Sequence, residues 1–270
     1  MEKALSFYLL LFINSTTVMV HAQNQLGAKL TSLGINSAAI KDIWNIESNV
    51  AGIVGLTRPT LAINYSKPLM VSDLSDQAMA LVLPFRKIDA GLSLQRYGIT
   101  SYHELKVGFA LAKQLGAQFT IAIKANLHQL KIVNYGSTLG FSSDIGLLYS
   151  PSTQLTFGLS VNNPALSNFN RLSKQLNIPT IVQIGAAYQT SDKILIATSI
   201  RKNFGNPIDA SLGIDYKILS QLSLRSGLSF KPFKHYVGFG LTYHSFALDV
   251  AIQSDVNVGY LPKISLAYAF

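Results

Sequence analysis

The chain contains no cysteine and few charged residues, and both absences restrict what it can be. Without cysteine it has no disulfide framework, no thiolate metal site and no attachment point for a lipid anchor. Charged residues make up 13% of the chain, whereas soluble domains carry about 25%. Hydrophobic residues nevertheless reach 49%, and the mean hydropathy is +0.29. This composition is unusual for a soluble protein.

Long hydrophobic runs are missing after the first residues. Residues 1–22 combine a basic Lys3, a short apolar run and the small-x-small ending Val20-His21-Ala22, which predicts a secretory signal peptide. The alternative is a membrane anchor, but the polar residues 14–17 leave the run too short to span a bilayer. Beyond residue 22 no stretch approaches about 18 uninterrupted apolar residues, so no membrane helix is predicted. An exported, apolar chain of this kind is typical of a transmembrane β-barrel in the outer membrane of a Gram-negative bacterium.

Residues 23–58 form an N-terminal segment that differs from the rest of the chain. The segment is rich in Gly and Ala, and its pattern predicts a short helix over residues 38–44 and a turn over 49–56. It is too short to be a domain, and it can lie inside the barrel or under its periplasmic mouth. Its candidate site residues are Ile43, Trp44, Asn49 and Gly52. They line an apolar ligand site or only anchor a plug to the barrel wall.

From residue 59 onward, apolar and polar residues alternate with the period of a β-strand. The last strand places Ile264, Leu266, Tyr268 and Phe270 on one face, as in the closing strand of an outer-membrane barrel. Residues 59–270 are therefore predicted to form an all-β, antiparallel transmembrane barrel of about fourteen strands. The expected strands are residues 59–67, 77–86, 89–97, 101–113, 118–129, 139–149, 154–162, 180–190, 193–202, 208–217, 221–230, 234–243, 245–253 and 261–270.

Eleven of the charged residues inside these strands lie on the face opposite the apolar one. A charge that faces lipid at mid-depth costs about 2–4 kcal/mol, whereas a charge that faces the lumen is tolerated. Basic and acidic members are nearly equal in number, which favours a salt-bridged interior over an ion-selective channel. In a soluble β-sandwich the charges would also lie opposite the apolar face, but the exposed face would carry more Lys and Glu than this chain has. The predicted lumen charges are Glu104, Lys106, Lys124, Asp144, Arg201, Asp209, Asp215, Lys217, Arg225, Asp249 and Lys263.

The connections between the predicted strands alternate in length, as in outer-membrane barrels with short periplasmic turns and longer outer loops. The long ones are residues 68–76, 130–138, 163–179 and 254–260. The longest carries Phe169, Arg171 and Lys174 and is the best candidate for a partner-binding loop. The alternative is an ordinary loop without a partner.

The sequence offers no pattern for an enzyme. Gly-x-Ser-x-Gly, His-Glu-x-x-His and phosphate-loop motifs are absent, and the five histidines are scattered. We therefore expect no catalytic activity, no cofactor and no metal site. The formal net charge of +9 suggests anionic surroundings such as the headgroups of outer-membrane lipid. Nucleic acid is not an expected partner of an exported chain.

Several short motifs together resemble one family of barrels. They are KDIW at 41–44, NVAG at 49–52, Tyr65 and its strand, LKVGFALA at 105–112, YGST at 135–138, IGLLY at 145–149, NP at 163–164, IP at 178–179 and YQTSDK at 188–193. They resemble the PorV/PorQ-like barrels of Bacteroidetes, within the FadL-type superfamily, although Val50 replaces the proline usual in that family. The resemblance implies fourteen strands around an N-terminal segment. It also implies an accessory or docking role with secretion-system proteins in type IX secretion, or alternatively transport of apolar small molecules across the outer membrane.

Overall fold

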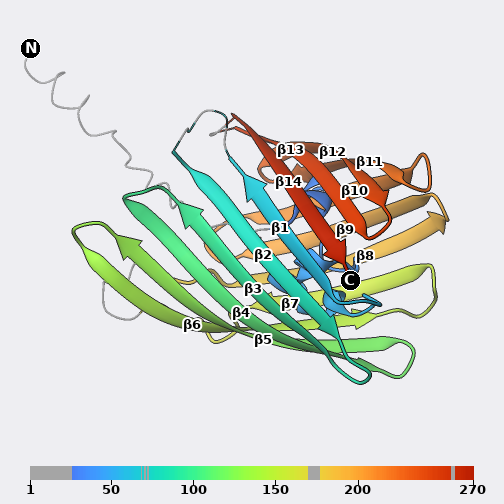
Figure 1. Ribbon diagram of the computed structural model, residues 1–270, viewed down its shortest axis with the longest axis horizontal. Helices are drawn as coiled ribbons and strands as arrows, with labels where there is room; N and C mark the ends of the chain where they lie inside the picture. Colours follow the sequence, from blue (N-terminus) through green and yellow to red (C-terminus); the bar gives the residue numbers. More distant parts are fainter. Residues whose placement is uncertain (1–25, 68, 70, 72, 170–176, 257–258) are drawn as a thin grey trace, which may run out of the picture.

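Fourteen antiparallel strands close into one barrel in the described part of the chain (Figure 1). The computed structural model describes residues 26–67, 69, 71, 73–169, 177–256 and 259–270. The predicted fold class is confirmed. The strands are β1 (Thr60–Ser66), β2 (Ser75–Pro84), β3 (Asp89–Gly98), β4 (Tyr102–Leu115), β5 (Phe119–Ile132), β6 (Gly136–Tyr149), β7 (Leu155–Asn162), β8 (Ile181–Ser191), β9 (Ile194–Asn203), β10 (Ile208–Lys217), β11 (Leu222–Phe230), β12 (Phe233–Tyr243), β13 (Phe246–Asp255) and β14 (Gly259–Ala269).

The two faces of each strand have opposite chemistry, as the alternation predicts. On β5, Ile123 is 61% exposed on the outside of the barrel, whereas the next residue, Lys124, is 2% exposed on the inside. The same alternation places large apolar side chains outward along the other strands. An apolar outer surface of this kind is stable against the hydrocarbon of a bilayer.

The barrel closes between its first and last strands. β1 pairs with β14 from Thr60 opposite Ala269 to Ser66 opposite Lys263, and the Phe270 amide donates to the Pro59 carbonyl at 2.9 Å. The end of the barrel that holds Pro59 and Phe270 also carries short turns. Because short turns face the periplasm in outer-membrane barrels, we call it the periplasmic end and the opposite end the outer end.

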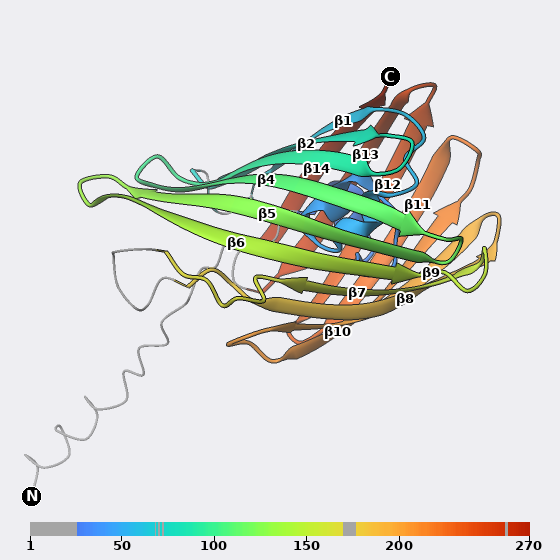
Figure 2. The ribbon, with the colours of Figure 1, turned by 90° about the horizontal axis from the view of Figure 1, so that it is seen from below.

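Two loops predicted from the sequence are wrong. Most of residues 130–138 belong to β5 and β6, which are 14 residues long each and are joined by a tight turn. β13 and β14 likewise extend into residues 254–260. The β5–β6 hairpin projects from the barrel at the outer end (Figure 2), where polar residues are compatible with a strand because no lipid tails surround them. Polar composition alone therefore suggested a loop.

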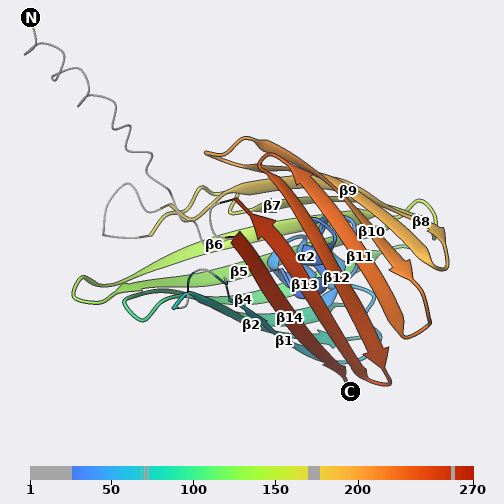
Figure 3. The same ribbon diagram turned by 90° about the horizontal axis from the view of Figure 1, so that it is seen from above.

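The plug, which we define as residues 26–56, lies inside the barrel (Figure 3). It contains the helix α2 (Ala28–Ser32) and two 3-10 helices, η1 (Ile43–Glu47) and η2 (Val50–Ile53). The helix predicted over residues 38–44 is wrong up to Asp42, whose extended backbone and side-chain oxygen cap η1 instead. α2 contacts β11 to β14, whereas η1 and η2 contact β2 to β6. No helix in the described ranges combines the length and apolar composition needed to cross a membrane.

Small residues on the inner wall let the plug approach the strands closely. A Cβ at Gly158 would overlap the carbonyl oxygen of Ala38, and one at Gly213 would overlap that of Leu33. Buried wall alanines such as Ala80, Ala110 and Ala197 complete the same contact surface. The many Gly, Ala, Ser and Thr residues on the inward face thus match a plug and not a water-filled channel.

This fit predicts that Gly158→Val displaces the plug and leaves the barrel intact, because the added side chain needs space that Ala38 occupies. Trp44 is the only tryptophan of the chain and is buried in the plug, so its fluorescence reports the plug position. We expect red-shifted emission with an unchanged β-sheet circular dichroism spectrum. Ala186→Val on the lipid-facing side of β8 is the control. Equal spectra for the two variants would contradict the prediction.

Candidate functional site

Glu47 of the plug joins two lysines of the wall. Its Oε1 lies 2.7 Å from Lys124 Nζ and its Oε2 lies 2.9 Å from Lys106 Nζ. Lys124 Nζ also donates to the Ile46 carbonyl at 2.8 Å. The Glu47 side chain is 1% exposed, so water does not screen these contacts. The sequence predicted both lysines as lumen charges but missed Glu47, because the alternation of inward and outward residues applies only to strands. The one sequence signal for Glu47 was an acidic residue next to Trp44 and Ile46, in the stretch WNIES at 44–48.

The two lysines keep the buried Glu47 carboxyl ionised. Burial by itself would raise the pKa of this carboxyl, but attraction by Lys106 and Lys124 is larger in sum. The pKa is lowered from 4.5 to about 2. The plug therefore carries a fixed negative charge near neutral pH.

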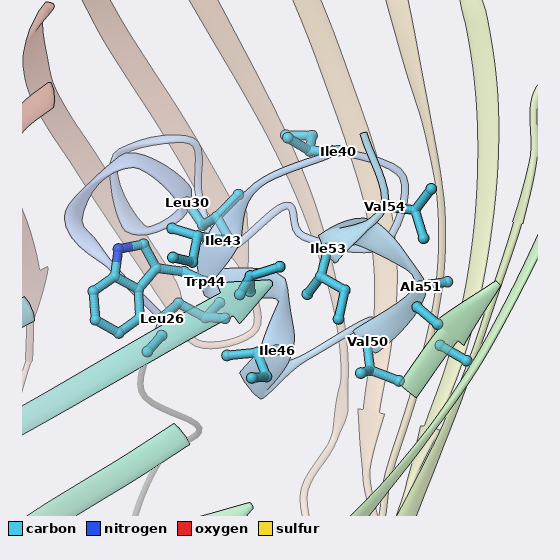
Figure 4. Close-up of a cluster of buried hydrophobic side chains, with 14 of the residues drawn as sticks. Leu26, Leu30, Ile40, Ile43, Trp44, Ile46, Val50, Ala51, Ile53 and Val54 are labelled. Atoms are coloured by element: carbon cyan, nitrogen blue, oxygen red, sulfur yellow. The ribbon is translucent and has the colours of Figure 1, made fainter. Parts of the chain in front are cut away.

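The apolar residues predicted as a ligand or plug site lie in a packed cluster (Figure 4). Ile43 and Trp44 are buried in this cluster together with Leu30, Ile46 and Ile53. The Trp44 ring leaves no space for a Cβ at Gly27. In this structure the side chains of Ile43 and Trp44 hold the plug together.

Asn49 and Gly52 shape the turn of the plug. Asn49 Nδ2 donates to the carbonyls of Ala38 and, at 3.1 Å, of Leu147 on the wall, and its Oδ1 accepts from the Ala51 amide at 3.2 Å. The Gly52 carbonyl accepts from the Asp42 amide at 3.0 Å. These contacts fix the turn against β6 and give the two residues a structural role.

A second buried charge group spans the wall on the other side of the barrel. Arg225 Nε lies 2.9 Å from Asp215 Oδ2, and its Nη1 lies 2.5 Å from Asp249 Oδ1. The guanidinium crosses β12 at Gly240, where a Cβ would overlap it. The arrangement ties β10, β11 and β13 together, as expected for a salt-bridged interior.

The other predicted lumen charges do not form one site. Asp144 accepts from Asn126 Nδ2 at 2.8 Å, and Asp209 accepts from the Lys231 amide at 2.9 Å. Glu104 accepts from the Tyr102 hydroxyl. No ion pair links Arg201 or Lys217 to a carboxylate of the described residues.

At the outer end, Asn163 folds the predicted partner loop inward. Its Nδ2 donates to the carbonyls of Ser167 at 3.1 Å and Ile178 at 2.8 Å, and its Oδ1 accepts from the Ser167 amide at 2.9 Å. Phe169 lies edge-on to the lumen-facing His128, with 6.1 Å between ring centroids. Phe169 is thus half-buried against the inner wall. Arg171 and Lys174 lie outside the described residues.

The wall has a seam between β6 and this loop. The described β6–β7 ladder runs only from Asp144 opposite Asn162 to Tyr149 opposite Phe157, so residues 136–143 of β6 have no β7 partner among the described residues. Beside the seam is a groove of about 510 Å³ with a mainly apolar lining. Its lining residues are Val107, Phe109, Ala125, Asn126, Leu127, Phe141, Ser142, Ser143 and Ser167.

No family model matches the chain, and no curated protein matches it. Among solved structures, the Pseudomonas putida toluene transporter TodX superposes with a TM-score of 0.70 at 12% identity, covering 91% of this chain and 98% of TodX. The Ralstonia pickettii toluene transporter TbuX gives 0.70 at 12%, covering 92% and 99%. A Pseudomonas aeruginosa FadL homologue gives 0.65 at 12%, covering 91% and 98%. The fold is that of FadL-type outer-membrane barrels. At this identity the likeness is one of fold, and the PorV/PorQ-like resemblance stays a prediction.

The Glu47 contacts predict that Glu47→Gln loosens the plug. The variant leaves the Lys124 ammonium buried without its carboxylate, a change that costs about 3–5 kcal/mol for a buried pair. We expect the urea midpoint of the Trp44 fluorescence change to fall well below that of the unmodified protein. Asp209→Asn, which alters an exposed contact to a turn amide, is the control. An unchanged midpoint for Glu47→Gln would show that the Glu47 contacts with Lys106 and Lys124 do not hold the plug in place.

The lowered pKa of Glu47 also predicts an acid limit for plug docking. A carboxyl whose pKa is depressed in the folded state stabilises that state above its unfolded pKa of 4.5, and this contribution is lost as the pH falls toward about 2. Trp44 emission should shift to the red across this window. The transition should be missing in Glu47→Gln. Blue-shifted emission of the unmodified protein at pH 2 would contradict this assignment.

Proposed function

We propose that this chain is an outer-membrane barrel that passes apolar small molecules through a lateral seam in its wall. The observation that carries the proposal is the interrupted ladder between β6 and β7 with the apolar groove beside it. Structural neighbours that are named as toluene transporters support the proposal by their fold. Export by the predicted signal peptide is part of the same proposal.

The outer surface of the barrel is compatible with a bilayer. Large apolar side chains cover it, and aromatic rings gather near the periplasmic end. Phe119 and Tyr149 stack with 4.7 Å between centroids, and Tyr268 lies 4.9 Å from Phe270. Aromatic girdles at this level are typical of outer-membrane barrels.

The packing of the plug favours a lateral path through the wall, and not an axial path along the lumen, for an apolar molecule. Plug backbone and wall residues touch directly at Gly158 and Gly213, and the centre is held by the Glu47 charge contacts. An apolar molecule on an axial path would have to separate these buried charges, which is unfavourable. The groove beside the seam instead presents Phe109, Leu127 and Phe141, which suit an apolar molecule.

The seam also has a polar latch that can open without breaking the barrel. Asn163 and the Asp144 carboxylate hold the start of the loop, since the Asn163 amide donates to Asp144 Oδ1 at 3.2 Å and to the Ser143 carbonyl at 2.9 Å. The strands on both sides remain paired below this point. Movement of the loop alone would therefore widen the seam.

A docking role in type IX secretion is a second candidate. The observation that favours it is a groove of about 450 Å³ at the outer end, formed by the partner loop around Ile178 and by the β9–β10 turn around Phe204. Secretion-system proteins remain the partners that the PorV/PorQ-like resemblance implies. Purification from the native outer membrane with stoichiometric protein partners would favour this role.

Blocking the seam tests the transport proposal. Because the chain has no cysteine, Ser143→Cys can be labelled selectively with a bulky membrane-permeable maleimide. We expect the labelled variant to lose most uptake of radiolabelled toluene in a Gram-negative host without its own FadL-type channel. Uptake of a polar solute of similar size should be low in every strain.

The matched control is Ile145→Cys, two residues along the same outward face, where Ile145 still pairs with Val161. Its labelling should leave toluene uptake unchanged. Toluene uptake equal to that of cells without the protein would overturn the transport function. Equal inhibition by the two labels would overturn the seam as the path.

A further inference from the structure

A cleft of about 250 Å³ lies at the periplasmic end, between the underside of the plug and strands β7 to β10. It is separate from the apolar groove at the outer end, which is lined by β4 to β6 and the partner loop. Four lysines line it, from three different parts of the chain. The full lining is Lys29, Ala39, Ile40, Lys41, Thr153, Gln154, Thr156, Ala187, Gln189, Lys193, Leu195, Asp215 and Lys217.

The wall lysines of this cleft face the lumen and not the lipid. Lys217 continues the inward series of Ser211, Gly213 and Asp215 on β10, and Lys193, in the turn before β9, lines the same cleft. The Lys217 amide donates to the Lys193 carbonyl at 2.8 Å, so the two residues are neighbours. They therefore do not serve as contacts to the headgroups around the barrel.

Three of the four ammonium groups lack a carboxylate partner among the residues that the structure describes. Lys29 pairs with Asp42 at 3.1 Å, and the carboxylate of Asp215 is bound by Arg225. Lys41, Lys193 and Lys217 form no ion pair within the described ranges. Like charges around a small cleft raise its positive potential, and a bound anion offsets their repulsion.

We propose that this cleft binds the oxyanion group of a small molecule, a carboxylate or a phosphate. Lys41, Lys193 and Lys217 supply the charge, and the side chains of Gln154 and Thr153 add neutral polar groups at the rim. The volume lies below the usual range of about 300–1,000 Å³ for drug-sized ligands, so only a small ligand fits.

The apolar residues of the cleft indicate that the ligand also has a hydrocarbon portion. Ala39, Ile40, Ala187 and Leu195 line the inner side of the cleft, where a short hydrocarbon portion of the ligand is buried. The site therefore takes organic anions better than inorganic ones. It does not depend on transport of apolar molecules, because it lies at the other end of the barrel and shares no residue with the seam.

The test measures anion binding by the purified full chain in a non-ionic detergent. Hexanoate and inorganic phosphate are titrated by calorimetry at low ionic strength, against Lys193→Gln/Lys217→Gln and a control, Lys113→Gln/Lys131→Gln, in which two exposed lysines on the outward faces of β4 and β5 are changed. We expect hexanoate affinity to fall about tenfold or more in the cleft variant only, since a charged hydrogen bond contributes on that order. Added salt should weaken binding as well.

The outcomes separate the sources of the anion. Tighter binding of hexanoate than of phosphate supports an organic anion that uses the apolar wall, and equal binding of both supports the oxyanion site but overturns the contribution of that wall. Absence of binding, or equal loss in both double variants, overturns the proposal. A negative result for anion binding says nothing about toluene uptake through the seam, so each proposal is tested independently of the other.

Discussion

The buried charge of Glu47 constrains how the whole interior is organised. A carboxylate at the centre of a membrane barrel is unfavourable unless cations satisfy it, and two wall lysines from adjacent strands do so at 2.7 and 2.9 Å. Lys124 in turn needs both Glu47 and the Ile46 carbonyl. Plug and wall are therefore mutually dependent: each leaves an unpaired buried charge if the other moves away. The small wall residues provide the close approach that makes these short contacts possible.

The barrel was predictable from the sequence because a lipid-facing strand allows few choices. The alternation at Phe119, Ile121 and Ile123 fixes which residues of β5 face outward, and the structure follows it. Inward charges such as Lys124 and Arg225 were predictable for the same reason. The ends of the strands were harder to predict, because the requirement for apolar outward side chains no longer applies outside the bilayer.

The interior of the plug was much less predictable. A segment of short turns has no repeating period, and its shape depends on contacts with residues far away in the sequence, such as Asn49 with Leu147. Glu47 could be recognised as an acid in an apolar stretch, but its partners could not be chosen from several inward lysines. The inward position of Phe169 depends on the loop geometry around Asn163, which no alternation pattern encodes.

The two ends of the barrel differ in chemistry, and the plug separates them. The outer half presents an apolar groove beside a wall seam, whereas the periplasmic mouth presents ammonium groups that have no carboxylate partner among the described residues, around a small cleft. A molecule that enters at one end meets none of the groups that recognise ligands at the other. This separation is a direct result of the filled lumen, because a continuous channel would expose both regions to the same water.

The position of the plug also has a consequence for how the chain assembles. The plug comes just before β1 in the sequence, yet α2 contacts β11 to β14 while η1 and η2 contact β2 to β6. It thus contacts strands from both halves of the chain. The pairing of β1 with β14 closes a loop of chain that contains all the other strands. Closing so long a loop is entropically costly and slow. Contacts of the plug with both halves offset part of this cost, because they hold the first and last strands near each other in the closed barrel.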